Sequence, residues 1–175
     1  MSIYMMRHGK TMANEKKYYA TPAEPLLPVD EKTFLKLREK VRALHVKAVI
    51  SSPYLRAKET AAMIAEDLPI VEEPLIREIN LGVLEGRSFY DAYDAYGDTL
   101  EPWIDDPYDN PPPMGESLRE AYKRAEAFLQ ATKEDTLYVS HDGFMRLVLA
   151  AQKRDVKFFF DCKIDNFQII EINKK

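Results

Sequence analysis

Two arginines and two histidines stand at or near the ends of short apolar runs of the sequence; they are Arg7, His8, Arg56 and His141. Guanidinium groups match the oxygens of a phosphoryl group in bidentate fashion, and an imidazole with one unprotonated nitrogen can attack phosphorus. Together these side chains would form a site for a phosphate ester. Taken singly, His8 could equally be a hydrogen-bonded residue at a strand end, and Arg56 a surface arginine.

The elements that must position these residues alternate along the chain. Short apolar runs predict strands at residues 3–6, 48–51, 70–72, 137–140 and 167–172. Apolar residues at helical spacing predict helices between them, as in residues 34–44, 57–68 and 118–128. This alternation predicts an α/β fold, a three-layer α/β/α sandwich with a mostly parallel central sheet and helices on both faces.

We expect the four side chains to meet at one edge of this sheet. In an open α/β sheet, ligands bind outside the carboxyl ends of the strands, where helix N-termini offer unpaired amides and a partial positive charge. Arg7 and His8 directly follow the first predicted strand, and His141 directly follows the fourth. Arg56 lies shortly after the second strand, and the Asn14 amide is a further candidate donor.

Two capping signals predict where helices begin. Ser52 followed by Pro53 places a capping hydroxyl before a proline at the first helical position. Ser117 and Glu120 have the spacing of a capping box. We therefore expect a helix to start directly after each serine.

One segment interrupts the alternation. Residues 88–114 contain seven acidic residues, six aromatic residues and no lysine or arginine, and they end in a run of three prolines. We predict that residues 88–116, approximately, form a lid inserted into a single domain that spans residues 1–175. The alternative is a surface excursion whose aromatic residues pack onto the body and whose carboxylates are solvated.

The composition favours one domain and a small-molecule function. The chain has 46% hydrophobic and 31% charged residues, which suits one soluble domain with a sizeable core. A net charge of −4 argues against a nucleic-acid partner, because affinity for phosphate backbones needs a basic face. No apolar run approaches the roughly 18 residues of a membrane span and no signal peptide is evident, so we expect a cytoplasmic protein without membrane contact.

Four motifs occur in the order that characterises one known family. They are Arg7-His8-Gly9-Lys10-Thr11 with Asn14, SSPYLRAKET at 51–60, REINLGVLEG at 77–86, and SHDG at 140–143. Together they resemble the successive signatures of the histidine phosphatase superfamily, the phosphoglycerate mutase-like proteins. The resemblance extends over nearly the whole chain.

The resemblance implies a role for each motif residue. His8 would accept the phosphoryl group as a phosphohistidine, while Arg7, Arg56 and His141 would hold its oxygens. Glu78 would donate a proton to the leaving alcohol, which requires a carboxyl group that stays protonated near neutral pH. Because the transition state of phosphoryl transfer is loose and carries its charge on the outer oxygens, these cations would suffice without a metal or other cofactor.

Several neighbouring residues have more open interpretations. Asn14 could bind phosphate or close a turn, and Glu85 is interpreted as structural. Asp142 stands where the family commonly has a small residue; its carboxylate could raise the pKa of His141 or cap the following helix. His45 matches no motif and is expected to face solvent.

The residues favour hydrolysis over isomerisation. We expect a metal-independent phosphomonoesterase that acts on a small phosphorylated metabolite, as a monomer or homodimer. A phosphoglycerate mutase-type enzyme would need extra cations, and residues 88–114 supply none; Lys10, Lys16 and Lys17 are the counter-evidence. A non-catalytic module that binds phosphate esters is the third possibility. The acidic, aromatic lid suits a neutral or cationic leaving group with a flat face, such as a nucleoside, an aryl group or a ribazole-like base.

Overall fold

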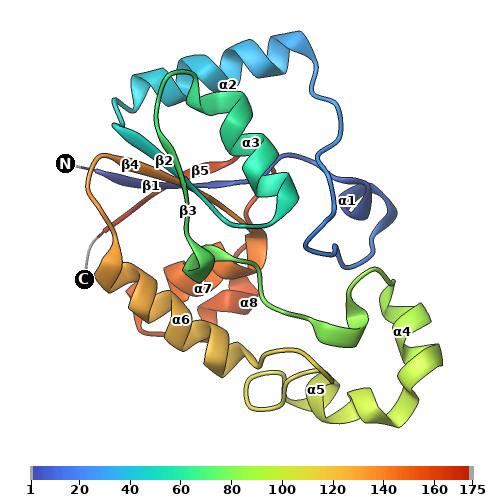
Figure 1. Ribbon diagram of the computed structural model, residues 1–175. Helices are drawn as coiled ribbons and strands as arrows, with labels where there is room; N and C mark the ends of the chain where they lie inside the picture. Colours follow the sequence, from blue (N-terminus) through green and yellow to red (C-terminus); the bar gives the residue numbers. More distant parts are fainter. Residues whose placement is uncertain (1, 174–175) are drawn as a thin grey trace.

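The computed structural model describes residues 2–173 and contains one five-stranded sheet (Figure 1). The strand order is β3-β2-β4-β1-β5. Only β5 runs antiparallel to its neighbour within this sheet. The predicted strands are confirmed, with ends that differ by two residues at most; the bounds are β1 Ile3–Arg7, β2 Ala48–Ser51, β3 Ile70–Glu72, β4 Thr136–Ser140 and β5 Ile169–Ile172.

Helices cover both faces of the sheet, as the alternation predicts. One face carries α2 (Glu31–Ala43) and α3 (Leu55–Ala65), and the other carries α6 (Leu118–Ala131), α7 (Asp142–Lys153) and α8 (Phe158–Asp161). Successive side chains of β1 point to opposite faces of the sheet. Met5 packs with α6, α7 and α8, and Met6 packs with α2 and α3. The three-layer α/β/α sandwich is thus confirmed. No helix of the described chain is long and apolar enough to cross a membrane.

Residues 88–116 form a small unit outside these three layers. The unit contains α4 (Phe89–Tyr96), a 3₁₀ turn η3 (Gly97–Leu100) and α5 (Glu101–Asp105). Phe89, Tyr96 and Trp103 pack with buried Val83 and Leu84 in a hydrophobic cluster of their own. Some of the aromatic residues therefore hold this unit to the body. Whether it acts as a lid remains a prediction.

One of the two predicted helix starts is confirmed. Ser117 and Glu120 form the expected capping box at the start of α6. The prediction at Ser52-Pro53 was wrong, because α3 begins at Leu55 with Tyr54 as its N-cap residue. The Ser52 hydroxyl accepts from Tyr54 N at 3.3 Å and also forms a hydrogen bond with the ring of His141.

Short connecting helices complete the path to the sheet edge. α1 (Met12–Lys16) follows β1 directly and begins with a capping box between Thr11 and Asn14. Two 3₁₀ turns, η1 (Pro74–Ile76) and η2 (Gly82–Leu84), flank the segment that carries Glu78. This segment has no regular secondary structure, so side chains must satisfy much of its backbone.

Candidate active site

Sheet topology brings the predicted residues to one edge. β4 lies between β1 and β2, and all three run parallel. Arg7 pairs in register with Ser140, so His8 and His141 leave neighbouring strands side by side. Their ring centroids lie 5.1 Å apart. The expected convergence at the carboxyl ends of the strands is confirmed.

The His8 imidazole is held as a neutral ring with one unprotonated nitrogen. The side chain is 3% exposed, and its Nδ1 lies 2.6 Å from the carbonyl oxygen of Gly9, to which it donates. Nε2 is therefore unprotonated, and it accepts a hydrogen bond from Arg56 Nε at 3.1 Å. Burial, reinforced by the positive charge of Arg56, lowers the pKa of His8 from 6.5 to about 3. This tautomer directs a lone pair into the site.

His141 is completely buried behind His8. Its Nε2 lies 2.7 Å from the Ser52 hydroxyl, and its Nδ1 has no hydrogen-bond partner among the described residues. Burial, followed by the charge of Arg56, lowers the pKa of His141 well below 6.5. The two roles expected for Asp142 were wrong, because its carboxylate accepts from Ile164 N instead and faces two arginines, Arg7 and Arg146.

Both arginines of the motifs are anchored by backbone carbonyl groups. Arg56 is 2% exposed and its Nη1 donates to the Thr21 carbonyl at 2.8 Å. Arg7 Nη1 donates to the Ile164 carbonyl at 2.5 Å, while Arg7 Nε is buried without a protein partner in the described chain. An unpaired buried donor is costly, so Arg7 Nε is available to an anionic ligand.

Glu78 lies at the N-terminus of α7. Its Oε1 accepts from Phe144 N at 2.9 Å and Ile79 N at 3.0 Å, and its Oε2 accepts from Gly143 N at 3.2 Å. A Cβ atom on Gly143 would lie 2.7 Å from Oε1, so the close approach requires glycine here. The helix N-terminus therefore fixes the carboxylate beside the cavity.

Asn14 serves the local structure and also lines the cavity. Its Oδ1 accepts from Thr11 N and from Asn166 Nδ2. Asn166 Nδ2 also donates to the carbonyl groups of His8 and Gly9, which ties the loop after β1 to the chain before β5. Sequence reasoning missed Asn166, because it lies outside every motif. The amide nitrogen of Asn14 is the atom that could face a phosphate.

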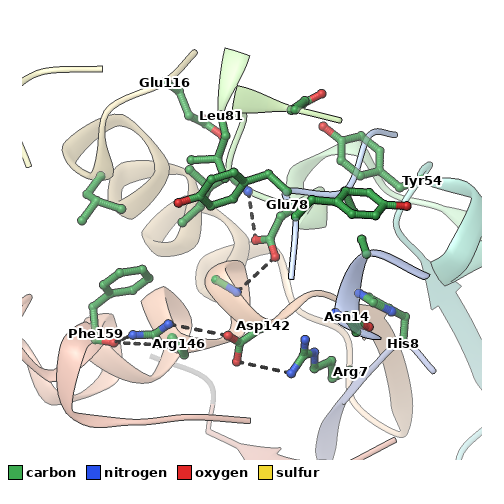
Figure 2. Close-up of a pocket in the computed structure, with 18 of the residues that line it drawn as sticks. Arg7, His8, Asn14, Tyr54, Glu78, Leu81, Glu116, Asp142, Arg146 and Phe159 are labelled. Atoms are coloured by element: carbon green, nitrogen blue, oxygen red, sulfur yellow. Dashed lines mark hydrogen bonds and ion pairs between the residues drawn. The ribbon is translucent and has the colours of Figure 1, made fainter. Parts of the chain in front are cut away.

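Most of these residues, but not His141, line a cavity of about 360 Å³. Figure 2 shows Arg7, His8, Asn14 and Glu78 around it. Arg7, His8, Arg56 and Glu78 lie on its wall, whereas the lysines that counted against hydrolysis do not. Glu85, interpreted as structural, also lines it, and burial raises the pKa of its carboxyl group. Six aromatic residues, none of them singled out for the wall by the motifs, complete the lining; they are Tyr18, Tyr19, Tyr54, Trp103, Phe159 and Phe160.

The wall comes mainly from elements other than residues 88–116. From that unit only Trp103, Pro107 and Glu116 reach the cavity. The α7–α8 region supplies five lining residues, including Arg146, which no motif singled out. The chain after α1 supplies three more. Among the described residues, no group of three or more His, Cys, Asp or Glu side chains is placed to hold a metal ion.

A comparison with protein families identifies this constellation. The model described as "Histidine phosphatase superfamily (branch 1)" matches residues 3–174. The chain belongs to the histidine phosphatase superfamily. The resemblance carried by the four motifs is thereby confirmed.

Several similar members of this superfamily carry phosphatase names. "Putative phosphoserine phosphatase 2" of Hydrogenobacter thermophilus is 27% identical over 98% of this chain and 88% of its own length. The crystal structure of the alpha-ribazole phosphatase from Shigella flexneri superimposes with a TM-score of 0.82 at 24% identity, covering 99% of this chain and 90% of that chain; this match shows the fold. Family membership and the names together support a phosphatase activity for this chain.

Other relatives carry a mutase name. "Probable phosphoglycerate mutase GpmB" of Klebsiella pneumoniae (strain 342) is 30% identical over 77% of this chain, and the match spans 64% of that protein's length. The choice between hydrolysis and isomerisation therefore depends on the site itself.

Proposed function

We propose that this protein is a metal-independent phosphomonoesterase that works through a phosphohistidine at His8. The observation that carries the proposal is a neutral imidazole nitrogen, His8 Nε2, at strand ends that also bring two unpartnered buried side-chain nitrogens. Within the described chain these are Arg7 Nε and His141 Nδ1, which becomes a donor once protonated. Such an arrangement suits a tetrahedral dianion with an attacking nitrogen at its centre.

The first half-reaction transfers the phosphoryl group to the enzyme. His8 Nε2 forms a bond to phosphorus while the bond from phosphorus to the leaving oxygen breaks. The proton stays on Nδ1 and is donated in a hydrogen bond to the Gly9 carbonyl oxygen, which stabilises the positive charge that develops on the ring. Arg7, Arg56 and His141 hold the outer oxygens, and the arriving dianion favours protonation of the otherwise neutral His141.

Glu78 acts in both half-reactions. It gives its proton to the leaving oxygen as the ester bond breaks, a contribution of about 10²- to 10⁴-fold for an alcohol. Water then attacks phosphorus, the nitrogen–phosphorus bond breaks, and Glu78 takes the proton from that water. Three backbone amides hold its carboxyl group in place.

The cavity supports hydrolysis of an ester with a flat, uncharged or cationic leaving group. A mutase must hold a second anionic group, yet the cation beyond the phosphate site, Arg146, is already paired with Asp142 and with the Phe159 carbonyl group. Aromatic side chains instead provide faces on which a ring can stack. An aryl, nucleoside or ribazole-like phosphate ester fits this wall.

The proposal is tested with the purified protein and p-nitrophenyl phosphate in the presence of a chelator. Turnover is expected for the wild type, and His8→Ala should abolish both turnover and acid-labile labelling of the protein. The matched control is His45→Ala, because His45 is exposed and remote from the cavity lining. Retained turnover in His8→Ala would contradict the nucleophile assignment.

The alternatives have their own outcomes in the same assay. Isomerisation of 3-phosphoglycerate with a bisphosphoglycerate primer, without ester hydrolysis, would indicate a mutase. Binding of phosphate esters without turnover would indicate a non-catalytic module.

A further inference from the structure

A buried guanidinium group holds the segment that carries Glu78. Arg124 of α6 is 8% exposed, and its Nη1 donates to the carbonyl groups of Leu75 and Arg77, each at 2.8 Å. Its Nη2 donates to the Glu78 carbonyl at 3.4 Å. One side chain thus satisfies three carbonyl groups in a stretch that has little regular secondary structure.

Glu116 links Arg124 to the rim of the cavity. Its Oε1 accepts from Arg124 Nη2 at 2.5 Å and from Asn80 N at 2.9 Å, and its Oε2 pairs with Arg77 Nη2 at 3.2 Å. Glu116 is 12% exposed, lines the cavity, and ends the unit of residues 88–116. The Glu116 carboxylate therefore binds both Arg124 and the backbone of the Glu78 segment at Asn80.

The other contacts of this segment are fewer. The Ser140 hydroxyl donates to the Ile76 carbonyl at 2.7 Å, and Glu116 N donates to the Asn80 carbonyl at 2.9 Å. Among the described residues, the hydrogen bonds to the Glu78 carboxylate all come from backbone amides, including that of its neighbour Ile79. Loss of the Arg124 guanidinium group would thus remove the hydrogen bonds that hold the backbone of the Glu78 segment, and with it the position of the carboxylate.

We propose that Arg124, through its pair with Glu116, is a positioning residue for the proton-transfer group Glu78. The inference rests on the proposed function, because it assigns Arg124 an effect only on the step in which Glu78 protonates the leaving oxygen. Arg124 does not line the cavity and touches no substrate. Its planar fork can bridge several carbonyl groups, which a lysine ammonium group at the end of a flexible chain cannot reproduce.

The test compares kcat/KM for an alkyl phosphate, such as glycerol phosphate, with kcat/KM for p-nitrophenyl phosphate. Both values report the steps up to release of the leaving group, and only the alkyl alkoxide needs protonation to leave. The ratio of the two is independent of the fraction of active enzyme, so partial unfolding does not change it. Arg124→Lys should lower the alkyl-to-aryl ratio by about 10-fold or more.

Two comparisons make the result specific. The control is Arg119→Lys on the same helix, since Arg119 is exposed and forms a single ion pair with Asp109; its ratio should equal that of the wild type. In a Glu78→Gln background, Arg124→Lys should produce no further fall in the ratio, because the group it positions is gone. Should Arg124→Lys not fold, Glu116→Gln, which keeps an acceptor for Asn80 N, takes its place with the same expected fall.

The outcomes separate this inference from the proposed function. If Arg124→Lys lowers kcat/KM equally for both esters, or for neither, the alkyl-to-aryl ratio stays at its wild-type value. This result would overturn the positioning role of Arg124 while leaving the proposed phosphatase activity intact. A Glu78→Gln variant with an unchanged ratio would instead overturn the role of Glu78, and the positioning role with it.

Discussion

Arg56 Nε donates a hydrogen bond to His8 Nε2 over 3.1 Å, deep in a site where both side chains are almost fully buried. The guanidinium group therefore touches the nitrogen that is aimed at phosphorus. Since a cation cannot share this position with an imidazolium ion, the contact requires a neutral His8. Burial adds to this requirement, and together the two effects lower the pKa of His8 to about 3.

The depressed pKa of His8 predicts a pH-dependent stability. Between about pH 3 and pH 6.5 the unfolded chain binds a proton at His8 that the folded chain does not bind. The free energy of unfolding should therefore be highest above pH 6.5 and fall as the pH decreases, by about 1.4 kcal/mol per pH unit for this group. His141 acts in the same direction, because burial also lowers its pKa.

Denaturant unfolding of wild type and His8→Gln between pH 4 and pH 7 measures this effect. The variant should lose less stability than the wild type as the pH falls, because it lacks the group that resists protonation. His45→Gln serves as the control, since the exposed His45 should leave the wild-type slope in place. Parallel curves for wild type and His8→Gln would contradict the depressed pKa.

The close approach of Gly143 to Glu78 gives a second prediction. In Gly143→Ala the new Cβ atom would lie 2.7 Å from Glu78 Oε1 and 2.9 Å from Ile79 Cδ1, so the carboxylate must move off the α7 amides. We expect kcat/KM for glycerol phosphate to fall by about 10-fold or more, with a smaller fall for p-nitrophenyl phosphate. Alanine favours a helix over glycine by about 1 kcal/mol, which opposes a general loss of stability.

A double variant checks that Gly143 acts through Glu78. Gly143→Ala in a Glu78→Gln background should add little to the loss on glycerol phosphate, because the displaced carboxylate is already absent. Full additivity of the two losses would show that the alanine perturbs something other than the proton-transfer group.

The sequence predicted the parts of the site that follow from strand order. Arg7 and His8 lie at the end of β1, and His141 directly follows β4. The parallel pairing of these two strands brings the three residues together independently of the loop conformations. The strands and the packed faces of the main helices were predictable for the same reason, since their periodicity reflects burial in the core.

The parts that depend on the folding of irregular segments could not be predicted. Ser52 and Pro53 have the residue types of a helix start, yet the helix begins only at Leu55. The Ser52 hydroxyl accepts from Tyr54 N and forms a tertiary hydrogen bond with His141. Asn166 is remote from every motif, and only the return of the chain into β5 places it beside Gly9. The composition of residues 88–114 did not indicate which of these residues line the cavity. From that range only Trp103 and Pro107 reach it.

Trp103 is therefore the residue through which residues 88–116 should influence selectivity. Its indole lines the cavity, whereas Tyr90 of the same unit is 79% exposed and lies outside the lining. If the indole stacks on a flat leaving group, Trp103→Ala should lower kcat/KM for naphthyl phosphate or a nucleoside monophosphate by roughly 3- to 10-fold, the range expected for an aromatic pair. The loss on glycerol phosphate should be smaller, because that leaving group offers no ring. Tyr90→Ala should leave the preference among these esters as in the wild type. A uniform loss on all esters in Trp103→Ala would mean that the indole only holds the unit against Val83 and Leu84, with which it packs, and that residues 88–116 do not select the substrate.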